Sequence, residues 1–237
     1  MAGKKERESE RRAIADKLRR EQEQREKRRN LLFLVGIVVV VVGLLAAAVI
    51  PYVKNQRREH ALAGTALDKL GVSESAASCD AILTKKTDHN QQHIPDPTPI
   101  TYPDSPPSFG PHRPSPAAFE RKFYTAQDRP EVATLVHNLE HGYTILWYDS
   151  TIKGDQLTAL KDLSASARTR DETAPAKFIV SAWDNAYGHF PAGKHIGISH
   201  WGAATSHVQL CGKVSGQVVN SFIKKYPAAD SPEPSSA

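Results

Sequence analysis

The longest apolar run in the chain extends from Leu31 to Val53 and contains no charged residue. At 1.5 Å per residue, about 20 apolar residues of helix span the roughly 30 Å hydrocarbon core of a bilayer. The run is rich in Val and Ile, yet in lipid every backbone polar group must be paired within the segment, which requires a helix. The pattern therefore predicts a single transmembrane helix at 31–53.

A cleaved signal peptide is the alternative, because Ala46–Ala48 offers small side chains of the kind found at cleavage sites. Signal peptides have a short basic start and an apolar region of about 7–15 residues. In this chain a charged tail of 30 residues precedes a longer apolar run. This arrangement favours an anchor that stays on the protein.

After the anchor, apolar positions follow helical and strand periods in turn. Val132, Leu135, Val136 and Leu139 have helical spacing, which predicts a helix at 130–141, and Gly142 suits the position after its last turn. Further helices are predicted at 155–168 and 214–226, and strands at 143–148, 177–183 and 196–201. This order of elements predicts an α+β domain with a mixed sheet and helices packed on it.

Composition divides the chain into parts. We expect a charged cytoplasmic tail at 1–30, the membrane helix at 31–53, a juxtamembrane helix and linker at 54–92, the α+β domain at 93–226 and a disordered tail at 227–237. Nine of the 16 prolines lie between residues 95 and 116, a stretch that can form neither a helix nor a central strand. We expect that stretch to be a rigid, extended loop lying over the domain.

The charges of the chain are distributed unevenly around the apolar run. Residues 15–30 hold seven Lys and Arg, whereas residues 54–70 hold four, so the positive-inside rule places the N-terminus in the cytoplasm and the domain outside the plasma membrane. Residues 1–30 contain twelve basic and seven acidic side chains, while residues 54–237 contain nineteen of each. Because the basic excess lies in the tail, it predicts contact with anionic lipid and not nucleic-acid binding.

Cys79 and Cys211 are the two cysteines of the chain, and both lie on the predicted outer side of the anchor. An even pair in an oxidising compartment is most simply a disulfide. A redox or metal-binding pair is the alternative, but the sequence has no C-x-x-C spacing and no third cysteine. We therefore predict a structural disulfide that joins the start of the domain to its end.

The sequence VHNLEHG places His137, Glu140 and His141 at the end of a predicted helix. His137 and His141 are one turn apart, so their imidazoles share a face and can share a metal ion. Glu140 would then act as a base, a third ligand or a residue that orients the others. The alternative is that these histidines cap the helix end, where a positive charge suits the helix dipole.

The sequence YPDSPPSFGPH brings a further imidazole. Its structural positions are Tyr102, Pro106, Pro107 and Gly110: prolines fix the loop, and glycine permits a close backbone approach, so that His112 is delivered to a defined place. His93 precedes this loop and is another candidate ligand. Three neutral imidazoles suit Zn²⁺ or Cu²⁺. In the alternative, the prolines pack on Trp147 or Tyr148 and His112 only hydrogen-bonds a carbonyl.

Two motifs together resemble a bacterial family that is catalogued as domain of unknown function number 3105. They are PP-x-x-G-P-H and V-H-x-L-E-H-G, and the resemblance covers about residues 93–226. The family usually has Thr and Ser where this chain has Ser108 and Phe109, and its late A-W-G appears here as His200-Trp201-Gly202. The resemblance implies an actinobacterial type of protein with a charged tail, one membrane helix and an exported domain, and it implies no activity.

The leading hypothesis is therefore a membrane-tethered domain that binds Zn²⁺ or Cu²⁺ through His112, His137 and His141, with Glu140 and His93 in support. A second hypothesis is a non-catalytic module that binds an envelope protein or a metal-handling partner, with an apolar patch near Phe109 and Phe119. The third is a metal-dependent hydrolase, since H-x-x-E-H is also the inverted zinc-protease motif. Those proteases need a long helix across a cleft, whereas Gly142 ends this helix at once, and we expect no enzyme activity.

Overall fold

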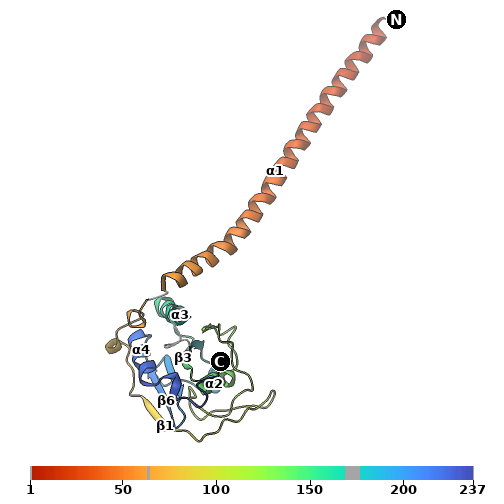
Figure 1. Ribbon diagram of the computed structural model, residues 1–237. Helices are drawn as coiled ribbons and strands as arrows, with labels where there is room; N and C mark the ends of the chain where they lie inside the picture. The colour runs from red at the N-terminus through yellow and green to blue at the C-terminus, as the bar shows by residue number, and fades with distance from the viewer. Residues whose placement is uncertain (1, 63–64, 169–176, 237) are drawn as a thin grey trace. The chain divides into compact units, whose positions relative to one another are not determined.

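A computed structural model describes residues 2–62, 65–168 and 177–236. The chain separates into two compact units, Met1–Arg57 and Arg58–Ala237. The first unit consists of most of helix α1 (Ala2–Leu62), the long helix that ends at the label N in Figure 1.

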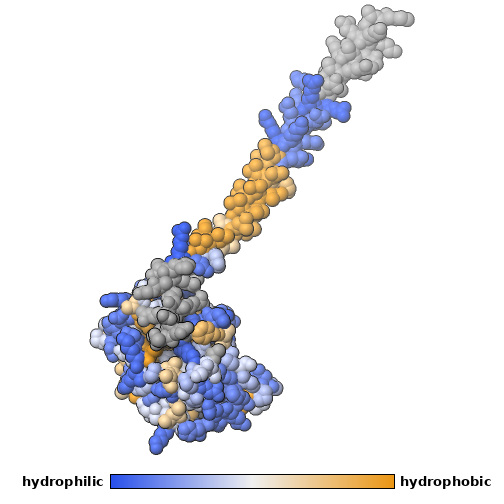
Figure 2. Space-filling view, viewed as in Figure 1, coloured by the Kyte–Doolittle hydropathy of each residue, from blue (hydrophilic) through white to orange (hydrophobic). Residues whose placement is uncertain are grey.

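Helix α1 carries the apolar run. Within the described part of the chain, its segment Arg19–Lys54 is the one helical segment long and apolar enough to cross a membrane. Its apolar side chains are exposed, Leu32 and Phe33 to 72% each, and Figure 2 shows them as an orange band next to the hydrophilic part of the tail. By length and composition, this segment suits a membrane anchor, and a signal sequence near an N-terminus passes the same test.

The second unit contains a sheet and its covering helices. In chain order its main elements are β1 (Leu83–Lys86), β2 (Phe123–Tyr124), α2 (Val132–Glu140), β3 (Thr144–Tyr148), α3 (Gly154–Arg168), β4 (Phe178–Ala182), β5 (Ile196–Trp201), β6 (Thr205–Cys211) and α4 (Gly216–Lys225). The predicted α+β class with a mixed sheet is confirmed. The six predicted elements are present with ends shifted by no more than two residues, and β1, β2 and β6 are elements that the prediction missed.

The sheet has the strand order β1-β6-β5-β3-β4-β2. β3 lies at its centre, parallel to β4 and antiparallel to β5, with Leu146 opposite both Val180 and Ile198. A parallel pair needs a crossover between its strands, and α3 lies in the connection from β3 to β4. The two short strands β1 and β2 form the edges, which limits the length of unpaired backbone there.

The sheet separates two apolar cores. Because side chains alternate along a strand, Leu146 and Tyr148 of β3 enter one core with α3 and α4, whereas Ile145 and Trp147 enter the other with α2. The first core is the larger. The second contains the apolar face of α2, the helix that also carries His137.

Helix α2 is buried on both sides. Val132, Leu135, Val136 and Leu139 face the sheet, as the helical spacing predicts. The polar residues of the helix are also buried, as is the residue directly after it: His137, Asn138, Glu140 and His141. The cover is the proline-rich segment, in which Pro106 and Pro107 are buried and Pro106 packs against Gly197 of β5. Packing of these prolines on Trp147 or Tyr148 is the alternative considered from the sequence, and the structure places Pro106 on β5, where Gly197 leaves room.

Residues 227–236 are ordered, contrary to the predicted disordered tail. They include a 3-10 turn (Ala228–Asp230), and Ser231 is buried. The segment packs against Gly142, whose φ is +88°; a Cβ there would lie 2.6 Å from the carbonyl oxygen of Ala228. Lys177 fastens its end, donating from Nζ to the carbonyls of His141, Pro234 and Ser236 at 2.7–2.8 Å. Low apolar content suggested disorder, but hydrogen bonding to the end of α2 overrides it.

Cys79 and Cys211 form a disulfide, which confirms the predicted pairing. It ties the segment before β1 to the last residue of β6, across a sequence separation of 132 residues. For a loop of this size, the restriction of the unfolded chain is worth about 4–5 kcal/mol.

We expect the double substitution of Cys79 and Cys211 by serine to lower the free energy of unfolding by about 4 kcal/mol, because it restores the entropy of the unfolded chain. Urea unfolding of the full chain in detergent measures this. An unchanged midpoint would show that the loop is already constrained in the unfolded state.

Candidate metal centre

Two segments bring imidazoles to the polar side of α2. His93 and His112 lie side by side because the two loop segments that carry them form a parallel β-bridge. In this bridge, Ile94 N donates to His112 O at 2.8 Å, and His112 N donates to Gln92 O at 3.0 Å. The loop between them is closed by Tyr102, whose hydroxyl donates to Pro111 O at 2.6 Å while its ring lies next to Gly110. In the structure, His112 thus follows a loop that is closed by this hydrogen bond and lies beside His93.

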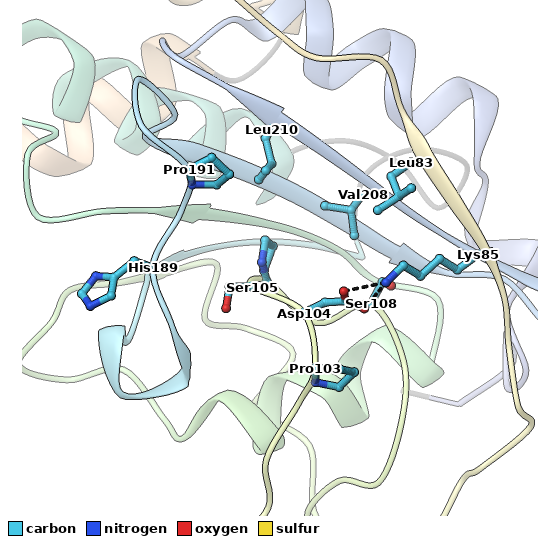
Figure 3. A pocket seen from close by; sticks show the side chains of 11 residues that line it. Leu83, Lys85, Pro103, Asp104, Ser105, Ser108, His189, Pro191, Val208 and Leu210 are labelled. Carbon is cyan, nitrogen blue, oxygen red and sulfur yellow. Dashed lines mark hydrogen bonds and ion pairs between the residues drawn. The ribbon is translucent and has the colours of Figure 1, made fainter.

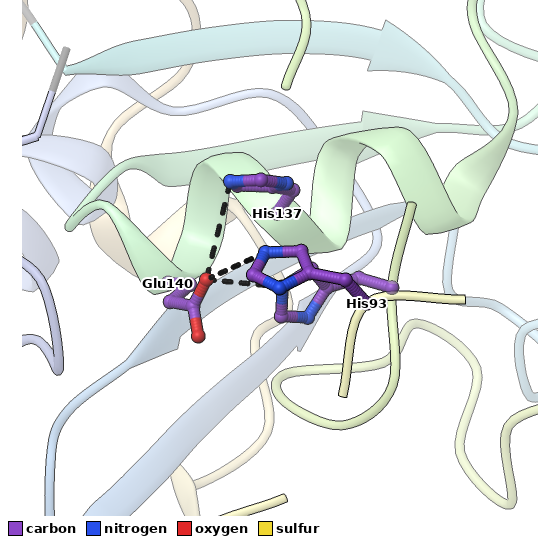
Figure 4. A group of neighbouring side chains, drawn as sticks. His93, His137 and Glu140 are labelled. Carbon is purple, nitrogen blue, oxygen red and sulfur yellow. Dashed lines mark ion pairs between the residues drawn. The ribbon is translucent and has the colours of Figure 1, made fainter. Parts of the chain in front are cut away.

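His93, His112 and His137 form a triangle of rings. Their centroids are 4.7, 4.8 and 4.9 Å apart, and a single oxygen of Glu140 faces all three (Figure 4). The Oε2 atom of Glu140 lies 3.0 Å from His112 Nε2, 3.8 Å from His93 Nε2 and 4.0 Å from His137 Nε2. For a tetrahedral ion with bonds of about 2.0–2.1 Å, ligand atoms are about 3.3 Å apart, so these separations bracket the value such an ion needs.

Backbone carbonyls fix the tautomers of two rings. Nδ1 of His112 lies 2.8 Å from Gly110 O, and Nδ1 of His137 lies 2.6 Å from Arg113 O. A carbonyl only accepts, so each Nδ1 carries the proton and each neutral ring keeps its lone pair on Nε2. Burial lowers the pKa of His137, which favours the neutral form of that ring. Such bonding of the far nitrogen is the usual support of a metal-binding histidine.

The polar atoms at the centre of this group have no hydrogen-bond partner among the described residues. These atoms are His112 Nε2 and both oxygens of Glu140, and both side chains have an exposed fraction of zero. An isolated buried carboxylate costs many kcal/mol unless a positive charge compensates it. His112 Nε2 and Glu140 Oε2 are 3.0 Å apart. With His112 neutral and protonated on Nδ1, their lone pairs face each other, and a cation between them would be coordinated by both.

The structure divides the predicted ligands into two overlapping groups. In the first, His93, His112, His137 and Glu140 have ligand atoms within 4.8 Å of one another. In the second, Glu140 meets His141 and Glu233, the latter from the tail. His141 Nε2 is 3.0 Å from His137 Nε2 and 3.5 Å from Glu233 Oε2. The predicted set is thus brought together, with His141 in the second group and His93 in the first.

Arg113 is a supporting residue that the sequence prediction did not identify. Its guanidinium donates to the carbonyls of Ile94, Pro95 and Thr98 at 2.9–3.3 Å, which fixes the loop that carries His93. It also donates to both carboxylate oxygens of Glu131, the residue before α2, at 2.5 and 2.8 Å. One side chain therefore holds the loop on the helix, while its backbone carbonyl orients His137.

Asn138 performs a similar role inside the VHNLEHG motif. It is fully buried; its amide group donates to Ala117 O at 3.0 Å and accepts from Ala117 N at 2.9 Å. This reciprocal pair fixes the end of the proline-rich segment to α2. Its position between two candidate ligands was a signal in the sequence, but only the structure shows its partner.

The late histidines lie outside both groups. His195 pairs with Asp149 at 2.8 Å, and His200 pairs with Asp230 at 2.7 Å. The ring of His207 stacks on Tyr226 with centroids 3.6 Å apart. Among the described residues, none of these joins a set of three converging metal-ligand atoms. Their contacts are those of packed, hydrogen-bonded side chains.

A separate pocket of about 340 Å³ lies between the proline-rich segment and the edge of the sheet (Figure 3). Lys85 of β1 pairs with Asp104 across it at 2.5 Å, and Leu83 and Leu210 form an apolar part of its lining. His189 lies at its rim. The apolar patch expected near Phe109 and Phe119 is only half present, because Phe109 packs against Trp201 while Phe119 is 42% exposed.

Residues 93–237 match the family described as protein of unknown function (DUF3105), which is more than half of the chain. The chain belongs to this family. The predicted resemblance is confirmed, and the DUF3105 segment contains every residue of both histidine and glutamate groups. No curated protein and no solved structure matches the chain. The family description assigns no activity, so the geometry of the site carries the functional argument.

The pairing of Glu131 with Arg113 makes stability depend on pH. Hydrogen bonds from Arg113 hold the pKa of the Glu131 carboxyl below its ordinary value of 4.5, against the opposing effect of burial, and a bond from Tyr187 adds to them. A lowered folded-state pKa contributes stability above about pH 4.5 and loses it as the pH falls through the folded-state pKa.

We therefore expect Glu131→Gln to lower the free energy of unfolding at pH 7 by about 1.5–3 kcal/mol and to flatten its fall between about pH 5 and pH 3. Urea unfolding across this pH range measures both effects. The exposed Glu120→Gln is the matched control. If the free energy of unfolding of Glu131→Gln falls as steeply with decreasing pH as that of the parent, other carboxylates determine the loss of stability in acid.

Proposed function

We propose that this chain is a membrane-anchored protein whose domain outside the cytoplasm binds a divalent transition-metal ion, Zn²⁺ or Cu²⁺. The ion would be bound by the first group of ligands, which we call the first position: the Nε2 atoms of His93, His112 and His137 and the carboxylate of Glu140. The observation that carries the proposal is the fully buried Glu140 carboxylate, whose Oε2 is faced by the Nε2 atoms of three imidazoles.

The donor set suits this class of ion. Three neutral imidazoles and one carboxylate are the nitrogen and oxygen ligands of Zn²⁺ and Cu²⁺, whereas Mg²⁺ and Ca²⁺ prefer oxygen ligands alone. Four protein ligands fill a tetrahedral shell, and catalytic zinc sites keep one position open. The first position therefore supports binding of an ion more directly than hydrolysis.

Glu140→Gln gives a test in which metal binding and a purely structural role predict opposite results. If the carboxylate serves a metal, the metal-free variant is at least as stable as the metal-free parent, because an uncompensated buried charge has been removed. If Glu140 is instead a structural partner of a protonated His112, the same change costs about 3–5 kcal/mol. Thermal unfolding in the presence of a chelator separates the two.

We also expect Zn²⁺ at about 100 times its dissociation constant to stabilise the parent by about 2.7 kcal/mol. Glu140→Gln and His112→Ala should lose most of this gain, because each removes a ligand. His189→Ala, an exposed histidine outside both groups, is the control and should keep it. Elemental analysis of the purified full chain reports the bound metal directly. Absence of metal from the parent at micromolar supply would refute the proposal.

The location is proposed from the apolar run and the distribution of charge around it. Seven Lys and Arg in residues 15–30 against four in residues 54–70 favour a cytoplasmic N-terminus. The disulfide between Cys79 and Cys211 supports an oxidising environment for the domain.

We expect the intact chain, residues 1–30 included, to remain in the membrane fraction after alkaline extraction. External protease added to cells with a permeabilised outer layer should cleave the domain and leave an N-terminal epitope protected. A purified chain that starts after Ala46–Ala48 would identify a cleaved signal peptide instead.

A further inference from the structure

Glu233 lies over the metal group although it is almost a hundred residues from the nearest ligand in the sequence. Its backbone N donates to Glu140 O at 3.0 Å, and its carboxylate Oε2 lies 3.5 Å from His141 Nε2. Lys177 holds the carbonyl groups on either side of Ser235, at Pro234 and Ser236. These bonds hold the tail so that the Glu233 carboxylate lies near Glu140 and His141. The ligand atoms of these three residues, the second group, lie within 4.8 Å of one another.

Glu140 belongs to both groups and has two oxygens to offer. Oε2 faces the three imidazoles, while Oε1 points away from them (Figure 4). Both oxygens are fully buried. An ion in the first position uses only one of them. A carboxylate with a second buried oxygen is suited to bridge two cations.

The contact between His137 and His141 points the same way. Nδ1 of His137 donates to Arg113 O, so its Nε2 carries the lone pair that lies 3.0 Å from His141 Nε2. An ion in the first position takes that lone pair. His141 Nε2 can then bind on the side of Glu233, where a second cation also relieves the charge that Glu140 and Glu233 bring together.

We propose that the centre holds two metal ions, with Glu140 as the bridging carboxylate and His141 and Glu233 as ligands of the second ion. This inference rests on the proposed function of the first position and adds a second ion, of the same divalent class, to it. Three protein ligands leave the second ion at least one position for water or a small oxyanion. Gln91 and Pro232, which are close in the sequence to His93 and Glu233, line part of a pocket of about 240 Å³.

The test is the number of ions per chain in the full-length protein purified in detergent, loaded with excess Zn²⁺ and freed of loose metal by gel filtration. We expect two Zn²⁺ per parent chain and one in Glu233→Gln. The Glu233 side chain is 45% exposed, so we expect this replacement to preserve the fold. Glu120→Gln, the matched exposed control, should keep two. His141→Ala should also fall to one.

Loading with Cu²⁺ gives a second readout, because ions bridged by one carboxylate couple magnetically. We expect an electron paramagnetic resonance signal well below two spins in the parent and a full single-ion signal in Glu233→Gln. One ion in the parent, two in Glu233→Gln, or two uncoupled Cu²⁺ ions would overturn the two-ion centre and leave the first position standing. Zero ions in the parent would refute the proposed function itself.

Discussion

The burial of one carboxylate constrains this whole part of the molecule. Glu140 lies on the polar side of α2 with no exposed surface, and its oxygens have no hydrogen-bond partner among the described residues. Water would solvate such a charge at little cost, whereas the interior demands a positive charge beside it. Two of the three imidazoles around it, His112 and His137, direct their Nδ1 protons at backbone carbonyls and so present the lone pair of Nε2 when neutral. A cation would satisfy these groups and the carboxylate together.

The fold meets this demand by covering a short helix on both sides. The sheet takes the apolar stripe of α2, and the proline-rich segment closes over its polar stripe. Two side chains fasten that cover. Arg113 binds backbone carbonyls at its start, and Asn138 binds the backbone at its end. Such support around the ligands holds metal sites in geometry, and it explains why so much of the hydrogen bonding of this region joins side chain to backbone.

Much of this arrangement could be predicted from the sequence, for physical reasons that also mark the limits. The helical spacing of Val132 to Leu139 and the apolar run of β3 identified the central elements, and the i, i+4 spacing of His137 and His141 identified the helix that carries candidate ligands. Edge strands as short as β2 carry too few residues for a period to show. The prediction did not include Glu233, because the composition of its segment suggests disorder. The contacts that hold this segment involve Lys177 and Gly142, which are distant from it in the sequence.

The candidate ligands are far apart along the chain, so an ion could bind them only once the domain has folded. His93, His112 and the α2 residues come from separate segments, and Glu233 comes from beyond the last helix. No partial chain on the ribosome or in a translocation channel can present this set, since each ligand is placed by contacts that form only when the domain closes. An ion bound at this centre would therefore be acquired after synthesis, from the pool around the folded domain, and its occupancy would report the metal supply of the compartment that the domain faces.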